Sequence, residues 1–157
     1  MKISIGIVNY NRLFYLRSCV KSLLYSVGDL DCEFICVDDN SHEKGTAEYL
    51  KDLQSQGWLV INQQDFRDGD KPQEYTEPIT AFAESLNILY RESSGDLIIP
   101  LQGDMQFIRK GWLEEVISLF SSAQNVGSVV LDAQRRVRLE NNCAFQKFKT
   151  NNYESFM

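Results

Sequence analysis

Histidine and cysteine are scarce in this sequence, which has one histidine (His42) and four cysteines among 157 residues. Zinc sites are built mainly from these two residue types, so a zinc site is not expected. The cysteines show no disulfide-framework spacing, and Cys32 and Cys36 fall on one expected strand, too far apart along it to be bridged. We therefore expect reduced, structural cysteines and a cytoplasmic location.

The sequence also lacks long apolar runs and basic stripes. No run approaches the about 20 residues that a membrane-spanning helix needs, and strand-like sequence already begins at Ile3, which leaves no room for a signal peptide. With 16 basic and 22 acidic residues the net charge is −6, which argues against a nucleic-acid partner. An anionic ligand would therefore need a divalent cation or a few local basic groups.

Hydrophobic residues make up 43% of the 157-residue sequence, which is enough to form the core of one domain. Strand-like and helix-like segments alternate along the chain, which predicts a three-layer α/β fold with a mostly parallel sheet. We expect a strand from Ile3 and further strands at 33–37, 58–62, 96–101 and 127–131, with helices at 13–27, 46–56, 79–93 and 111–122.

Two regions interrupt this alternation. Residues 63–78 form a longer connection than is usual, so we expect either a mobile surface loop or a functional loop. Residues 132–157 are rich in Asn, Gln, Arg and Lys and have little periodicity. The predicted organisation is a domain over 1–131 followed by an irregular tail over 132–157, which is either the start of a further region or a truncated end.

Three of the expected strands end abruptly in polar side chains. In a parallel sheet these ends lie at one edge, where α/β proteins bind ligands. The alternative for the second strand is an Asx-turn that caps its own backbone, and for the third a plain turn between strand and helix. The polar residues are Asn9 and Tyr10, then Asp38 and Asp39, and finally Gln102, Gly103 and Asp104.

The polar strand ends carry a resemblance to a known family. Residues 8–12 (VNYNR) match the pattern Pro-Thr-Tyr-Asn-Arg, residues 37–41 (VDDNS) match Val-Asp-Asp-Gly/Asn-Ser, and residues 95–98 (GDLI) match Gly-Asp-Tyr-Ile. Over about residues 3–131 the chain resembles the amino-terminal, donor-binding part of a family 2 glycosyltransferase of the GT-A fold, possibly truncated. The resemblance implies inverting, metal-dependent transfer of a sugar from a nucleotide-diphosphate sugar, with a UDP-sugar favoured, to an acceptor hydroxyl.

The resemblance also implies roles for the residues at the first two strand ends. Asp39 would bind the edge of the base. Asn9 and Tyr10 would frame that base by hydrogen bonding and stacking, and Asp38 would shape the pocket. Arg12 and Lys71 are candidates for countering phosphate charge, although both could be solvated surface groups.

At the third strand end, residues 102–104 (QGD) stand where the family has its Asp-X-Asp metal motif. Asp104 would carry Mg²⁺ or Mn²⁺, and one carboxylate with two phosphates and waters is an acceptable Mg²⁺ shell. Gln102 replaces the first aspartate of the motif. Gly103, without a Cβ, would let the backbone pass close to a phosphate.

Other parts of the family pattern are incomplete in this chain. Asn87 matches the asparagine of an Ala-Arg-Asn segment, and it would either bind ligand or brace the sheet edge. Leu86 replaces the arginine that helps to hold the diphosphate in the family. No catalytic base is assigned, because the acidic residues of the tail stand in no motif; they are Asp132, Glu140 and Glu154.

Two further functions compete with an active glycosyltransferase. A non-catalytic nucleotide-binding module or degenerate fragment lacking the acceptor half would explain the short chain and the replacements at Gln102 and Leu86. A phospho-acceptor receiver domain would also have an Asp-Asp pair at a strand end. In receivers, however, the pair closes the first strand and a lysine ends a later one, whereas here the pair closes the second strand.

Overall fold

The computed structural model describes residues 1–66, 78–122, 125–129, 147–150 and 153–156. The chain divides into two compact units, Met1–Gly111 and Trp112–Met157. All of the expected site residues that the structure describes belong to the first unit.

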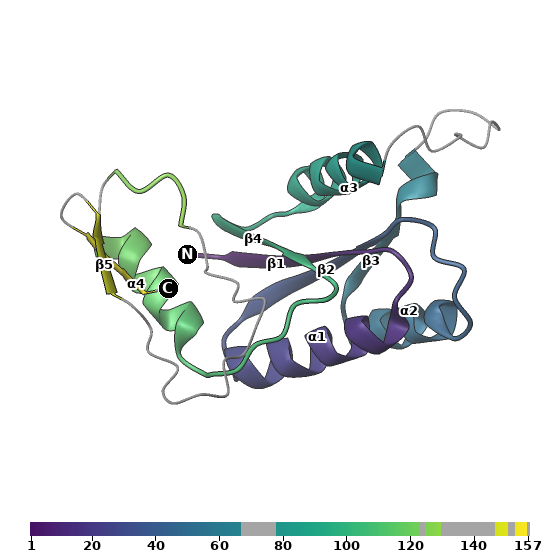
Figure 1. Cartoon of the computed structure of the whole chain (residues 1–157), viewed down its shortest axis with the longest axis horizontal. Helices are drawn as coiled ribbons and strands as arrows, with labels where there is room; N and C mark the ends of the chain where they lie inside the picture. Colours follow the sequence, from purple (N-terminus) through teal and green to yellow (C-terminus); the bar gives the residue numbers. More distant parts are fainter. Residues whose placement is uncertain (67–77, 123–124, 130–146, 151–152, 157) are drawn as a thin grey trace. The chain divides into compact units, whose positions relative to one another are not determined.

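Four parallel strands form the sheet of the first unit, in the spatial order β3-β2-β1-β4 (Figure 1). They are β1 (Ile3–Asn9), β2 (Cys32–Asp38), β3 (Leu59–Asn62) and β4 (Leu97–Gln102). Val8 near the end of β1 is paired with Val37 of β2 and with Gln102 of β4. The residues that follow these three strands therefore emerge at the same edge of the sheet.

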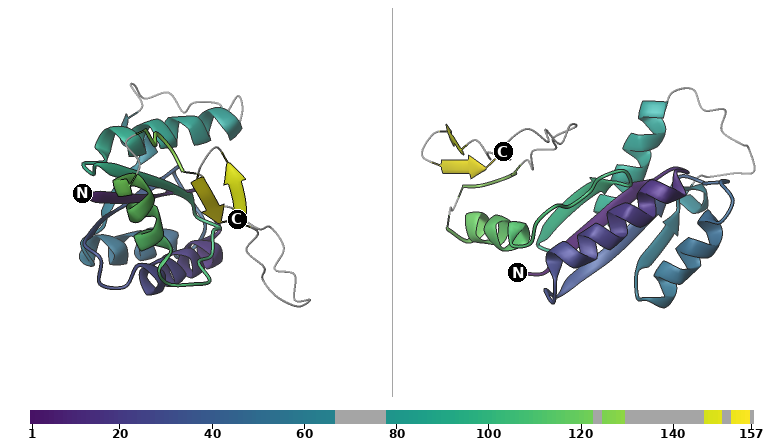
Figure 2. Two further views of the ribbon diagram at one scale, coloured as in Figure 1. Left: turned by 90° about the vertical axis from the view of Figure 1, so that its left-hand side faces the viewer. Right: turned by 60° about the horizontal axis from the view of Figure 1, so that its bottom comes forward.

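Helices cover both faces of this sheet. Helices α1 (Leu13–Val27) and α2 (Thr46–Ser55) lie on one face, and α3 (Pro78–Glu92) lies on the other, as Figures 1 and 2 show. The buried side of α1 has the spacing of three and four residues that its sequence predicted, with Leu16, Val20, Leu23 and Val27 among its buried residues. The expected three-layer α/β fold is confirmed, and the described sheet of this unit is entirely parallel.

Apolar residues are buried on both faces of the sheet, and one buried cluster lies between α3 and the central strands. All seven residues of β1 are buried, which is typical of a parallel strand covered on both faces. Gly6 brings α3 close to β1, because a Cβ at this position would lie 2.3 Å from Cδ1 of Leu89. Val8, Ile88 and Leu89 belong to the same buried cluster.

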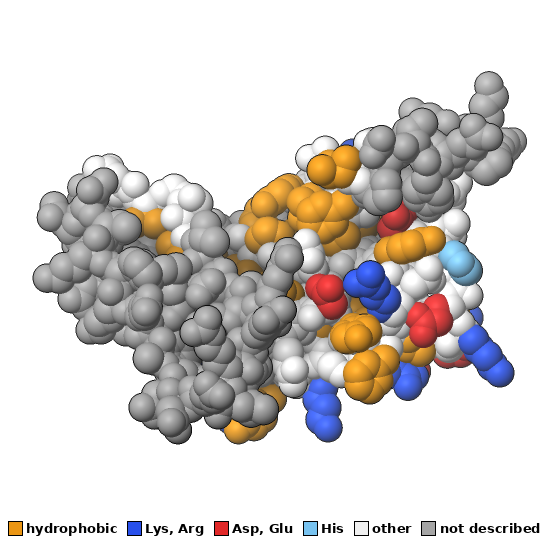
Figure 3. Space-filling view, in the orientation of Figure 1, with side chains coloured by type: hydrophobic (Ala, Val, Ile, Leu, Met, Phe, Trp, Pro, Cys, Tyr) orange, Lys and Arg blue, Asp and Glu red, His pale blue; other side chains and the backbone are white. Residues whose placement is uncertain are grey.

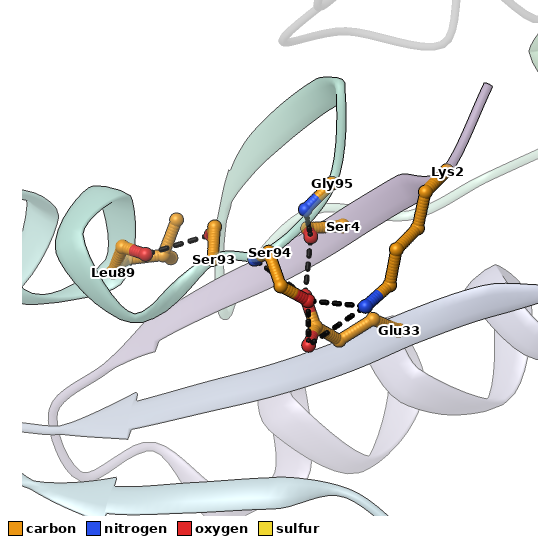
Figure 4. A network of polar contacts seen from close by, with 7 residues as sticks. All are labelled: Lys2, Ser4, Glu33, Leu89, Ser93, Ser94 and Gly95. Carbon is orange, nitrogen blue, oxygen red and sulfur yellow. Dashed lines mark hydrogen bonds and ion pairs between the residues drawn. The ribbon is translucent and has the colours of Figure 1, made fainter.

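The amino ends of the strands carry a polar network, here named the amino-edge cluster: Lys2, Ser4, Glu33, Ser94 and Gly95 (Figure 4). Glu33 accepts hydrogen bonds from the Ser4 hydroxyl, from the Ser94 amide (3.0 Å) and from the Ser94 hydroxyl (2.6 Å). The Gly95 amide donates to Ser4 Oγ at 2.8 Å. Partial burial alone would raise the pKa of Glu33, but the hydrogen bonds from Ser4 and Ser94 and the charge of Lys2 lower it below its usual value.

The second unit contains α4 (Trp112–Ser122) and an antiparallel pair, β5 (Lys147–Thr150) with β6 (Tyr153–Phe156). These two strands lie in the stretch expected to be irregular, and four residues each are too few to show a clear alternation in sequence. The strand expected at 127–131 is not seen over residues 127–129, and residues 130–131 lie outside the described part. The domain boundary at residue 131 stays a prediction.

The long connection of the first unit begins with a short 3-10 helix, η1 (Gln63–Phe66). Residues 67–77, with Lys71, lie outside the described residues, as do Asp132, Glu140 and Cys143. None of the described helices has the length and apolar character needed to cross a membrane.

Candidate functional site

A cavity of about 510 Å³ opens where the strand order reverses, between the carboxyl ends of β1 and β4. The chain runs outward from β1 to β2 and β3, then returns to place β4 on the other side of β1, and such reversals are the usual ligand sites of open α/β sheets. The volume of the cavity is typical of small-molecule sites. We name it the carboxyl-edge cavity; it is lined by Val8, Asn9, Tyr10, Arg12, Asp39, Ala81, Phe82, Ser85, Gln102, Gly103 and Asp104.

Asp38 organises the loop beside this cavity rather than lining it. Its carboxylate accepts hydrogen bonds from Asn9 Nδ2 (2.7 Å), from the Ser41 amide (2.8 Å) and from the Ser41 hydroxyl (2.7 Å). It is 3% exposed, so these bonds compensate for burying its charge. The Asx-turn alternative therefore describes Asp38 well.

Asp39 does line the cavity, although it too is buried. Its amide donates to the carbonyl of Asn9 at 2.8 Å, which ties the end of β2 to the end of β1. Tyr10 follows Asn9 and is half-exposed, with its ring 6.1 Å from that of His42 in an edge-to-face arrangement. The structure thus brings Asn9, Tyr10 and Asp39 to one cavity and gives the two adjacent aspartates different surroundings.

The segment that presents Arg12 is held by a reciprocal contact between two loops. Asn11 and Arg12 both have positive φ, 53° and 56°. Asn11 Oδ1 accepts hydrogen bonds from the amides of His42 (2.9 Å) and Glu43 (3.0 Å), and Glu43 Oε2 in turn accepts one from the amide of Leu13 (2.9 Å). Glu43 thereby satisfies an amide in the first turn of α1, which lacks a capping side chain of its own. Sequence reasoning missed this role of Asn11 and Glu43.

The end of β4 approaches β1 closely. The Gly103 amide donates to the carbonyl of Val8 at 3.0 Å, and a Cβ at Gly103 would lie 3.0 Å from Oδ1 of Asn9. Asp104 then comes beside Arg12, with Oδ2 3.5 Å from Nη1. Both side chains are substantially exposed, so this is a weak ion pair that a ligand can rearrange.

The donor groups decide what kind of metal site Asp104 could form. Among the described residues, no group of three or more acidic, histidine or cysteine side chains is placed to hold a metal ion. Asp104 offers a hard carboxylate at the cavity, and Mg²⁺ normally keeps several waters and binds substrate phosphates. The residues present therefore fit a cation shared with a diphosphate, not a metal centre built by the protein alone.

Helix α3 lines the cavity with residues other than the one expected from the sequence. Asn87 is exposed and is not among the residues that line the cavity, and Leu86 packs against the buried core cluster. Ala81, Phe82 and Ser85 line the cavity instead. In the sequence these three have the spacing of core residues, so nothing marked them as part of a site.

Two buried thiols lie behind the site. Burial is the main reason why the pKa of Cys19 rises to about 12, and burial likewise raises the pKa of Cys36. Both thiols therefore stay protonated at neutral pH and act as small hydrophobic side chains. The exposed surface is mixed: on the face drawn in Figure 3, acidic and basic side chains are interspersed with hydrophobic ones, so neither sign of charge dominates there.

Comparisons with known proteins agree with this arrangement. The family model described as glycosyl transferase family 2 matches residues 4–142. A crystal structure of S. aureus TarS 1–349 in complex with UDP is similar with a TM-score of 0.57 and 18% identity, covering 78% of this chain and 32% of that one. The structure of TarS 1–349 in complex with UDP-GlcNAc has a TM-score of 0.56 at the same identity and coverage.

These structural matches confirm the fold expected from the resemblance, and the chain spans about a third of the length of these TarS 1–349 structures. A comparison with curated protein sequences gives no match.

Proposed function

Because the chain belongs to glycosyl transferase family 2, we propose that it binds a nucleotide-diphosphate sugar, most favourably a UDP-sugar, in the carboxyl-edge cavity. It would act as the donor-binding part of an enzyme that transfers the sugar to an acceptor hydroxyl. The observation that carries this proposal is the convergence of three strand ends on one cavity of suitable size. The complexes of TarS with UDP and UDP-GlcNAc support the choice of ligand. A cytoplasmic location stays a prediction.

The cavity has two chemically different ends. Asn9 and Asp39 are buried, whereas Arg12 and Asp104 have exposed side chains. A neutral base and ribose can use the buried hydrogen-bonding groups, with Tyr10 available for stacking. Phosphates carry charge and need the cationic Arg12. We therefore propose that the nucleoside lies at the Asp39 end and the diphosphate at the Arg12–Asp104 end.

Departure of a nucleoside diphosphate builds negative charge on its phosphates. We propose that Asp104, together with the diphosphate, holds Mg²⁺ or Mn²⁺, which when bound would neutralise part of this charge. Arg12 would be released from Asp104 and would turn to the phosphates, while Gly103 leaves space for their close approach. Inversion at the anomeric carbon and attack by an acceptor hydroxyl follow from the family resemblance, and no described residue is assigned as the base.

A second function, nucleotide binding without catalysis, is favoured by one observation. Asp104 is the one carboxylate that the end of β4 supplies, and Arg12 already pairs with it. Both proposals predict that nucleotide binds, and they differ in whether the donor sugar is released or transferred.

Calorimetric titration with UDP and GDP, each with and without Mn²⁺, tests the proposal. We expect UDP to bind and Mn²⁺ to tighten it weakly, with a metal affinity in the millimolar range or about −4 kcal/mol. Gln102→Asp should strengthen the Mn²⁺ effect by adding a second carboxylate. If neither UDP nor GDP binds, the proposal is refuted. Release of sugar from UDP-GlcNAc would favour the enzyme over the binding module.

A further inference from the structure

Ser85 has a buried hydroxyl that the protein itself does not use. The residue is 0% exposed, and its Oγ has no hydrogen-bond partner among the described residues. Serine hydroxyls within helices normally bond back to a carbonyl in the preceding turn. The other serines of α1, α2 and α3 all do so; they are Ser18, Ser22, Ser26 and Ser55.

One of the two carbonyls of the preceding turn that Ser85 could use already has another side-chain partner. Ala81 lies four residues before Ser85, and its carbonyl accepts a hydrogen bond from Nε2 of Gln63 at 3.1 Å. The same Nε2 also donates to Glu84 Oε2 at 2.9 Å, which holds the Gln63 side chain in place. Leaving a buried hydroxyl unsatisfied is unfavourable for folding, so its presence at the wall of a cavity calls for a ligand.

The register of α3 on the sheet places Ser85 over the carboxyl end of β1, at the wall of the cavity. Leu89 packs over Gly6 of β1. Ser85 is one helical turn before Leu89, and α3 runs opposite to the strands because it connects two parallel ones. One turn of helix equals about two residues of strand, so Ser85 lies over Val8. Val8 immediately precedes Asn9, whose carbonyl binds the amide of Asp39, and the carbonyl of Val8 itself binds the amide of Gly103.

We propose that the hydroxyl of Ser85 binds the nucleoside part of the ligand, at its base edge or ribose, and contributes to the choice of nucleotide. This inference rests on the proposed function, because the ligand is the nucleoside diphosphate proposed above. The nucleoside suits Ser85 better than the diphosphate does, because Ser85 is buried whereas Arg12, the cationic side chain among the described residues that line the cavity, is exposed. A hydroxyl that both donates and accepts suits either group of the nucleoside.

The test is Ser85→Ala in the full 157-residue chain, with UDP binding measured by calorimetry and thermal unfolding measured without ligand. We expect UDP binding to weaken about three- to tenfold, the effect of losing one hydrogen bond. The Tm of the free protein should stay the same or rise by about 2–4 °C, because an unsatisfied buried hydroxyl is removed and alanine favours the helix. A role in folding alone would not produce weaker binding together with equal or higher stability.

Two variants serve as controls. Ser26→Ala also removes a buried helical hydroxyl, but one that bonds to the Leu23 carbonyl at 2.8 Å and does not line the cavity. It should lower Tm and leave UDP affinity unchanged. Ser85→Cys keeps the shape of the side chain, although sulfur is larger than oxygen, and replaces the hydroxyl by a weak donor, so it should weaken UDP binding as Ser85→Ala does.

The outcomes separate this inference from the proposed function. UDP affinity that is unchanged in Ser85→Ala but reduced in Asp39→Ala would overturn the role of Ser85 and leave the proposed function standing. Weaker UDP binding accompanied by a lower Tm would likewise overturn it, because a structural defect would then explain the loss. If the wild-type chain binds neither UDP nor GDP, the proposed function fails and this inference fails with it.

Discussion

The two ends of the same parallel strands carry polar clusters that serve opposite purposes. At the amino ends, the Glu33 carboxylate is enclosed by donors from Ser4 and Ser94, with Lys2 Nζ at 4.0 Å. At the carboxyl ends, the polar residues surround a cavity of about 510 Å³. The polar groups of the amino-edge cluster bind one another, whereas those of the carboxyl edge surround a space that a ligand can fill.

The difference shows why an acidic residue that is buried or partly buried is not by itself a sign of a binding site. Glu33 and Asp38 both satisfy their oxygens with serine donors inside the protein, and each joins two segments of chain. Asp39 and Asp104 differ from them in lining a cavity. Binding capacity is expected where polar groups face a space that a ligand can fill, and stability is expected where they face one another.

The largest effect should come from Gly95→Ala, which would disrupt the packing of Gly95 against Ser4 in the amino-edge cluster. A Cβ at Gly95 would lie 2.6 Å from the backbone nitrogen of Ser4, and backbone cannot move aside as a flexible side chain can. We expect a loss of about 2–3 kcal/mol in unfolding free energy, measured by urea denaturation. Gly127→Ala is the control, because nothing lies within 4 Å of its added Cβ. Equal effects of the two variants would contradict the closed packing of this edge.

The adjacent residues Asp38 and Asp39 at the carboxyl edge should differ in what their replacement affects. Asp38→Ala should lower the unfolding free energy by about 1–3 kcal/mol, because it leaves buried donors of Asn9 and Ser41 without a partner. Asp39→Ala should instead weaken UDP binding by about 1–3 kcal/mol and affect stability less. Urea denaturation and calorimetry on both variants check this division. If Asp38→Ala alone weakened binding, the assignment of the two residues would have to be exchanged.

Glu33 makes the stability of the amino edge depend on pH. Its pKa is lowered in the folded protein, so its contribution to stability is complete above the unfolded value of about 4.3 and is lost as pH falls through the lower folded value. Glu33→Gln should cost about 1 kcal/mol at pH 7 and should lose less further stability on acidification than the wild type. Unfolding free energies between pH 7 and pH 3 test this. Parallel pH profiles of the two proteins would show that Glu33 does not contribute.

Arg12→Gln should have the smallest effect. Its ion pair with Asp104 is exposed, so the unfolding free energy should change by less than about 0.5 kcal/mol. UDP binding should weaken by about 0.5–1 kcal/mol while uridine binding stays the same, because Arg12 is proposed to contact the phosphates. Arg17→Gln, which alters a cation lying over the Tyr49 ring outside the cavity, is the matched control. Equal losses for UDP and uridine would contradict a phosphate contact.

Much of the secondary structure could be predicted from sequence because its elements are long and periodic. The helix expected at 13–27 is α1, and the expected helices at 46–56, 79–93 and 111–122 agree with α2, α3 and α4 to within one residue at each end. The short strands of the second unit were missed, since four residues carry too little pattern. Among the site residues, Asn9, Tyr10, Arg12, Asp39, Gly103 and Asp104 do line one cavity, while Asp38 and Asn87 do not.

Hydrophobic periodicity and abrupt changes of polarity are local properties of the chain, so the alternation of strands and helices and the polar residues at the strand ends could be predicted from the sequence. It could not distinguish Asp38 from Asp39, since their roles depend on which donors of another strand and loop reach each carboxylate. Nor could it select Ser85 from the other helical serines. The packing of α3 over β1, a contact between segments far apart in the chain, places that hydroxyl at the cavity wall, where it has no hydrogen-bond partner among the described residues.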